Sequence, residues 1–304
     1  MKANHLSRRG AELLLAGVII ARATSYLFSK LILEGMGMFN LLGVRFTLAF
    51  TLLAVLFFPR LKSMSRKTFV AGVMMGGMYF LVVAAELSGL KRMSSGNASF
   101  LVNTAIVLVP LLQAILRRRF PEGKVILSVL LCMLGVGILT LGSRMGFGSG
   151  ERWCLLAAFL YACTILLTDR LSHSGIDTLT AGVVQVGIIG ALSLTASFLT
   201  ETPRLPSGST EWLGIVMLAA VCSCFGFTLQ PVAQSGTTAE RAGMFCALNP
   251  IVSAALGVIF LNETFTVKTV IGGILILLGI LLAEMPQRRE KRCRPYHRCA
   301  VNKL

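Results

Sequence analysis

The feature that most constrains this chain is a series of long apolar segments, each roughly 20 residues, separated by short polar turns. A helix of that length crosses a hydrocarbon core of roughly 30 Å, and a helix satisfies its own backbone polar groups where no water is present. The segments are residues 11–29, 38–58, 68–90, 95–116, 124–142, 151–170, 178–199, 211–230, 241–260 and 267–284. The sequence therefore predicts an all-α polytopic membrane protein with ten transmembrane helices.

Composition excludes a water-soluble domain, because 55% of residues are hydrophobic and only 14% are charged. The net charge of +16 does not indicate a nucleic-acid partner, since membrane proteins gather Lys and Arg in their cytoplasmic loops. With the N-terminus placed inside, 20 of the 29 Lys and Arg fall on the inner side and seven on the outer side. We expect a multi-pass protein of the cell membrane with both termini cytoplasmic and a basic cytoplasmic tail at 286–304.

The two halves of the chain match each other at fixed offsets. An offset of 144 places Gly279 over Gly135 without a gap, and an offset of 139 places Arg22 over Tyr161. Each half contains an odd number of predicted helices, so the halves insert with opposite orientation. We expect two inverted five-helix repeats around a central cavity. The expected repeats are residues 11–142 and 151–285.

Residues 238–285 carry a spaced set of helix-shaping residues. Pro250 lies in one apolar run, Glu263 follows thirteen residues later in a polar turn, and Gly272 and Gly279 lie on one face of the next run. This pattern resembles the end of an EamA-type repeat, the unit of the drug/metabolite transporter superfamily. The resemblance implies a secondary transporter that exports small metabolites such as amino acids, or drugs, by alternating access. We interpret these four residues as structural, with Glu263 capping the last helix, whose N-terminal dipole favours an anion.

The first half departs from the family pattern. Pro110, also interpreted as structural, lies one helical turn later than the position aligned with Pro250. Basic residues stand where the family has its Glu, and Arg22-Ala23 stands where family members often carry Trp-Gly.

Two arginines lie within predicted spans. Arg22 is twelve positions into the first span, near mid-depth, where a charge costs roughly 2.5 to 3.5 kcal/mol. It is either a cavity-facing cation that binds an anionic substrate group, such as a carboxylate, or a structural partner of Glu12 or Glu86, or a side chain that snorkels to an interface. Arg45 lies in the run LLGVRFTLAF, which resembles the second-helix pattern of the same family. The resemblance implies an Arg near the outer end of the cavity, so Arg45 is a second substrate-binding candidate. Its alternative is interfacial snorkelling.

Glu86 is the carboxylate best flanked by apolar sequence. A carboxylate in such surroundings can take up and release a proton, so Glu86 is the candidate for proton coupling. The alternative is an ion pair with Arg22, Lys91 or Arg92.

Five neutral polar residues within spans can bind a ligand or a neighbouring helix: Asn103, Gln113, Gln185, Gln230 and Asn249. Of these, Asn103, Gln185 and Asn249 are further substrate-binding candidates. Their alternative role is hydrogen bonding between helices. Asn249 is favoured for the cavity because the adjacent Pro250 frees a backbone carbonyl.

Other functions find little support in the sequence. No nucleotide-binding motif is visible, so we expect no cofactor and energy supplied by a gradient. Cys293, His297 and Cys299 are too few ligands for a zinc site, and no His lies in a span to support an enzyme, so we expect neither a metal site nor catalysis. We expect a small-molecule substrate and a lipid bilayer as partners. The sequence does not decide whether the protein forms a homo-oligomer. The remaining alternatives are a facilitator or importer of sugars or nucleotide sugars, and a non-transporting membrane scaffold.

Overall fold

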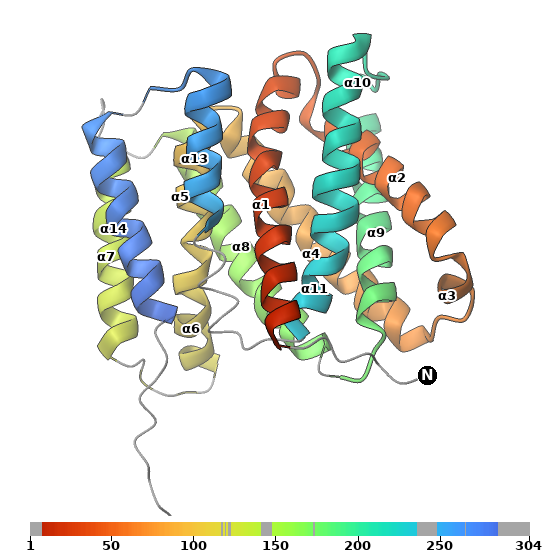
Figure 1. The fold of residues 1–304 in the computed structure, drawn as a ribbon, viewed down its shortest axis with the longest axis horizontal. Helices are drawn as coiled ribbons and strands as arrows, with labels where there is room; N and C mark the ends of the chain where they lie inside the picture. The colour runs from red at the N-terminus through yellow and green to blue at the C-terminus, as the bar shows by residue number, and fades with distance from the viewer. Residues whose placement is uncertain are drawn as a thin grey trace, which may run out of the picture.

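The computed structural model describes residues 8–116, 118, 120, 123–140, 148–172, 174–235, 248–264 and 266–284. In this part of the chain the regular structure is helical throughout (Figure 1). The first half contains α1 (Arg8–Leu33), α2 (Met38–Leu56), α3 (Phe58–Lys62), α4 (Arg66–Leu90), α5 (Ser95–Asn103), α6 (Ala105–Leu116) and α7 (Gly123–Thr140). The second half contains α8 (Ser149–Ser172), α9 (Thr178–Thr200), α10 (Gly208–Met217), the π-helix η1 (Leu218–Phe227), α11 (Thr228–Ser235), α13 (Leu248–Leu261) and α14 (Val267–Glu284).

Among the described residues, seven helical segments are long and apolar enough to cross a membrane. Two of them are composite, because α5 continues into α6 and α10 continues through η1 to Gln230. Three shorter apolar helices accompany them, at Gly123–Ile138, Asn249–Leu261 and Val267–Leu282. The chain is therefore an integral multi-pass membrane protein, as the sequence predicts, while the number of ten crossings stays a prediction.

Several sequence expectations concern residues outside this part of the chain. They include the start of the predicted span 241–260 and the basic tail at 286–304. Pro110 lies inside α6 and Pro250 inside α13.

The helices α7 and α14 lie side by side at one edge of the bundle and run antiparallel (Figure 1). A Cβ atom on Gly135 of α7 would lie 2.6 Å from the carbonyl oxygen of Gly272. A Cβ atom on Gly279 of α14 would lie 2.8 Å from the carbonyl oxygen of Ser128. Each glycine therefore lets the backbone of its helix approach the other, the device that membrane helices use for close packing.

A second pair, α2 and α9, is built in the same way. A Cβ atom on Gly43 would lie 2.7 Å from the side chain of Leu194, and one on Gly187 would lie 2.7 Å from the side chain of Phe50. Gly43 and Gly187 are 144 positions apart, as are Phe50 and Leu194. In each helix pair, the contact that a glycine of one helix makes is therefore repeated by the residues 144 positions away, the offset that aligns the two halves of the sequence.

Two glutamates of the second half cap helices of the first half. The carboxylate of Glu263 accepts hydrogen bonds from the backbone N–H (2.7 Å) and the hydroxyl (2.8 Å) of Ser95, the first residue of α5. The carboxylate of Glu201 accepts from the backbone N–H of Asn40 (2.8 Å) in the first turn of α2. The expectation that Glu263 caps the last helix is wrong, because α5, not α14, supplies the donors.

Candidate substrate-binding site

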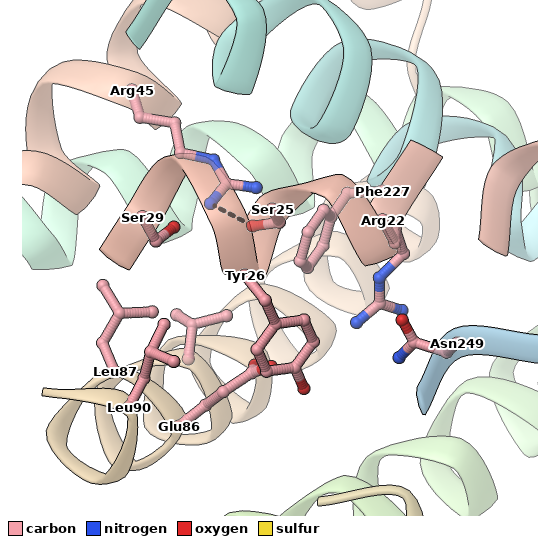
Figure 2. Close-up of a pocket in the computed structure, with 11 residues that line it drawn as sticks. Arg22, Ser25, Tyr26, Ser29, Arg45, Glu86, Leu87, Leu90, Phe227 and Asn249 are labelled. Atoms are coloured by element: carbon pink, nitrogen blue, oxygen red, sulfur yellow. Dashed lines mark hydrogen bonds between the residues drawn. The ribbon is translucent and has the colours of Figure 1, made fainter. Parts of the chain in front are cut away.

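A small cavity lies between α1, α2, α4, η1 and α13 (Figure 2). Its free volume is about 20 Å³, which accommodates a water molecule but not a metabolite. The helix α1 contributes residues spaced three and four apart, so one face of this helix forms a wall of the cavity. The polar lining consists of Arg22, Ser25, Ser29, Arg45, Glu86 and Asn249.

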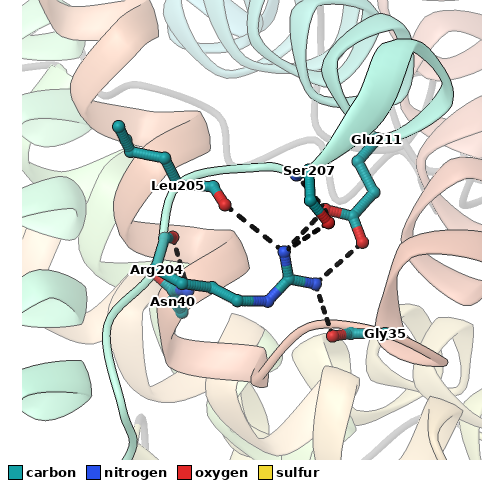
Figure 3. Close-up of polar contacts among 6 residues, drawn as sticks. All are labelled: Gly35, Asn40, Arg204, Leu205, Ser207 and Glu211. Carbon is teal, nitrogen blue, oxygen red and sulfur yellow. Dashed lines mark hydrogen bonds and ion pairs between the residues drawn. The ribbon is translucent and has the colours of Figure 1, made fainter.

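The guanidinium group of Arg22 is held by neutral partners. Its Nη1 atom donates to the hydroxyl oxygen of Tyr161 (3.0 Å) and to the side-chain oxygen of Gln230. The amide nitrogen of Gln230 donates to the same Tyr161 hydroxyl (3.3 Å), which closes the cluster. Among the described side chains, Glu211 pairs with Arg204 (Figure 3), and no carboxylate lies within ion-pair distance of Arg22. The positive charge of Arg22 is therefore oriented without being neutralised by a salt bridge.

Arg45 is more deeply enclosed, with an exposed fraction of 2%. Its Nε donates to the hydroxyl of Ser223 (2.8 Å) and its Nη1 to the hydroxyl of Ser25 (3.0 Å). Its Nη2 atom is buried and has no hydrogen-bond partner in the described structure. The snorkelling interpretation of Arg45 is therefore wrong: the side chain points into the protein and lines the cavity (Figure 2).

Phe227 connects the two arginines. The Cζ atom of Arg22 lies 4.6 Å from the centre of the Phe227 ring, and that of Arg45 lies 5.9 Å from it. A cation near an aromatic face is stabilised by the ring quadrupole. The ring thus lies near both guanidinium groups and helps to stabilise each of the two positive charges.

Glu86 faces the same cavity from α4 and lies close to Tyr26 (Figure 2). In the described structure it forms no ion pair with Arg22, Lys91 or Arg92, and the guanidinium of Arg92 instead donates to the carbonyl oxygen of Ser88. At the 144-residue offset that aligns the two halves, Glu86 is the counterpart of Gln230, whose side chain accepts a hydrogen bond from Arg22.

The structure separates the three neutral candidates. Asn249 lines the cavity, and its buried side-chain oxygen has no partner among the described residues. Asn103 donates to the carbonyl oxygen of Ser99 on its own helix (2.8 Å). Gln185 is buried in α9, and neither it nor Asn103 belongs to the cavity lining.

Two residues of the site, Tyr161 and Phe227, escaped the sequence analysis, whereas Gln230 was among the polar residues of the spans that it considered. The offset of 139 that aligns Arg22 with Tyr161 was a usable signal for the first. Nothing in the sequence marks Phe227 among the 18 phenylalanines.

The charges around the cavity favour an anion. Two guanidinium groups face one carboxylate across the cavity, so the lining is positive when all three groups are ionised. Arginine presents planar paired donors that match a carboxylate or phosphate. Intramembrane charges placed in this way usually mark a substrate or ion pathway.

Similarity to known proteins identifies the family of the chain. A model of the EamA-like transporter family matches residues 9–141 and 148–285. An uncharacterized transporter of Archaeoglobus fulgidus is 27% identical over 289 residues, covering 91% of this chain and 98% of the relative. The uncharacterized transporter YetK of Bacillus subtilis is 24% identical over 299 residues, covering 92% of this chain and 88% of the relative. A solved crystal structure matches with a TM-score of 0.67 at 21% identity over 91% of this chain and 98% of its own, a likeness of fold alone.

The family match over both halves of the chain and the relatives named as transporters show that the chain is a membrane transporter. The chain belongs to the EamA-like transporter family, within the drug/metabolite transporter superfamily.

Proposed function

We propose that this protein is a secondary transporter that exports small carboxylate-bearing metabolites, amino acids and related compounds foremost, across the cell membrane. The observation that carries the proposal is the buried pair of arginines, Arg22 and Arg45, on one cavity within the membrane-spanning region. A buried donor without a partner costs about 1 to 3 kcal/mol, so the free Nη2 of Arg45 favours a ligand that accepts a hydrogen bond there.

The cavity also offers groups for the opposite end of an amino acid. The carboxylate of Glu86 and the unpartnered side-chain oxygen of Asn249 both face it. In the proposed complex the substrate carboxylate binds Arg22 and Arg45, and the substrate ammonium group binds near Glu86 and Asn249. The charges of the lining and of the substrate then compensate each other.

The proposed mechanism is alternating access by two inverted repeats, residues 11–142 and 151–285. The glycine contacts of α7 with α14 and of α2 with α9 support it, because each pair repeats its contacts at the 144-residue offset. The cavity lies where helices of the two halves meet. Its free volume of about 20 Å³ means that the halves have to separate before a metabolite can enter.

Glu86 is the proposed proton carrier. It faces the substrate cavity and forms no salt bridge with the described basic residues, so it is available to lose or gain a proton as the substrate leaves or enters. Both termini are placed in the cytoplasm, on the strength of the excess of Lys and Arg in the loops of that side.

The test is flux of labelled metabolites into proteoliposomes under an imposed pH gradient, for wild type, Arg22→Ala, Arg45→Ala and a matched control, Arg60→Ala. Arg60 is exposed on α3, so its substitution removes the same charge outside the cavity. We expect Arg22→Ala and Arg45→Ala to abolish flux of carboxylate compounds while Arg60→Ala retains it. Flux of only neutral or cationic compounds, unchanged in Arg22→Ala, would overturn the proposed substrate class. Flux that ignores the pH gradient would favour a facilitator.

A further inference from the structure

A groove separate from the central cavity lies between α4 and the end of α8. Its volume is about 400 Å³. It is lined by Arg66, Lys67, Val70, Met74, Leu171 and Ser174, together with Ala71 at its base. Because α4 belongs to the first half and α8 to the second, the groove crosses the boundary between them.

The groove has a basic rim and an apolar floor. Arg66 and Lys67 are exposed in the first turn of α4, and Nζ of Lys67 donates to the carbonyl oxygen of Ser174. Among the described side chains, Arg66 has no carboxylate within ion-pair distance. Val70 and Met74 continue the same side of α4 and are 46% and 47% exposed. A charged end and an apolar end thus lie along one helix face.

The spacing of these residues matches a lipid leaflet. Met74 is eight residues beyond Arg66, which corresponds to about 12 Å along the helix axis. Half of a hydrocarbon core of roughly 30 Å is about 15 Å, so a rim at headgroup level places the floor among the acyl chains. A soluble metabolite would leave this floor without a matching partner.

The surrounding charge selects the sign of the headgroup. Residues 58–67, which span α3 and the start of α4, contain four basic residues and no acidic residue. The other two basic residues, Arg60 and Lys62, are exposed on α3, next to α4. A headgroup that carries its own ammonium group would add a fifth positive charge here, whereas an anionic headgroup compensates the existing ones.

We propose that this groove is a binding site for an anionic glycerophospholipid. Its phosphate diester is bound by the guanidinium of Arg66 and the ammonium of Lys67, which keeps donors to spare beyond its bond to Ser174. One acyl chain lies along Val70 and Met74. The lipid bridges α4 and α8, and so contacts both halves of the protein.

The experiment is native mass spectrometry of the full-length protein in detergent, titrated with phosphatidylglycerol or with phosphatidylcholine of the same acyl chains. We expect one phosphatidylglycerol to bind in preference to phosphatidylcholine. Arg66→Gln should weaken phosphatidylglycerol binding roughly tenfold, the scale of one lost charge-assisted contact. Arg60→Gln removes the same charge outside the groove and should change binding less than twofold.

A second variant tests the apolar floor without changing any charge. Val70→Trp fills the groove at an exposed position and should weaken phosphatidylglycerol binding as strongly as Arg66→Gln does. Equal losses of phosphatidylglycerol binding in Arg66→Gln and Arg60→Gln would mean that binding depends only on the general surface charge. That result would overturn the proposed site. Unchanged binding in Val70→Trp would likewise overturn it, because the headgroup would then bind without the groove.

Discussion

Arg22 and Tyr161 touch at the centre of the bundle, with the Nη1 atom of Arg22 3.0 Å from the hydroxyl oxygen of Tyr161. The two residues lie 139 positions apart, the offset at which the starts of the two halves align. Residues that occupy equivalent positions in two related halves meet only where the halves face each other. The charge proposed to bind substrate is therefore oriented by its own counterpart in the other half.

Tyr161→Phe should impair transport without removing the charge. The substitution keeps the ring and deletes the hydroxyl that accepts from Arg22 and Gln230. A hydrogen bond to a charged group is worth about 1.5 to 3 kcal/mol, so we expect KM for a carboxylate substrate to rise about tenfold or more. The measurement is concentration-dependent flux in proteoliposomes. An unchanged KM would mean that Arg22 keeps its orientation without Tyr161.

Glu86→Gln should separate substrate movement from proton movement. An amide at this position resembles Gln230, which stands 144 positions later, and cannot carry a proton. We expect exchange of labelled for unlabelled substrate to persist while accumulation driven by a pH gradient is lost. Glu34→Gln is the matched control, because Glu34 is exposed beyond the end of α1 and outside the cavity. Accumulation that survives in Glu86→Gln would exclude this carboxylate as the proton carrier.

Much of the fold is readable from the sequence because a membrane imposes simple rules. A helix has to be long and apolar to cross lipid, so each predicted segment coincides with a helix wherever the structure describes it. The 144-residue offset also carried packing information: it relates Gly135 to Gly279, and both glycines lie at the contact between α7 and α14.

The site was less predictable because polarity within a span does not fix the direction of a side chain. Asn103 satisfies its amide on its own helix, whereas Asn249 faces the cavity. Arg45 is buried because Ser223, 178 positions away, supplies a partner. A partner at such a sequence separation cannot be inferred from the residues next to the arginine.

Glu263→Ala should destabilise the protein through α5. The substitution removes the carboxylate that accepts from the backbone and hydroxyl of Ser95. Loss of a helix cap typically costs about 0.5 to 2 kcal/mol, so thermal unfolding in detergent should occur at a lower temperature. Glu201→Ala should have an effect of similar size, because it removes the cap of α2. Glu34→Ala, at an exposed carboxylate, should leave the unfolding temperature unchanged.

Gly135→Ala should destabilise the α7 and α14 pair, whereas Gly137→Ala two positions further along should not. At Gly135 the new Cβ would lie 2.6 Å from the carbonyl oxygen of Gly272, and a backbone atom cannot rotate away, so the helices have to separate. Such overpacking costs about 1 to 3 kcal/mol. At Gly137 the new Cβ lies more than 4 Å from the described neighbouring residues, and alanine raises helix propensity by up to about 1 kcal/mol. Thermal unfolding of the two variants in the same detergent compares the effects directly. Equal shifts in both would mean that helix propensity, not the close approach of α7 and α14, determines what a glycine contributes here.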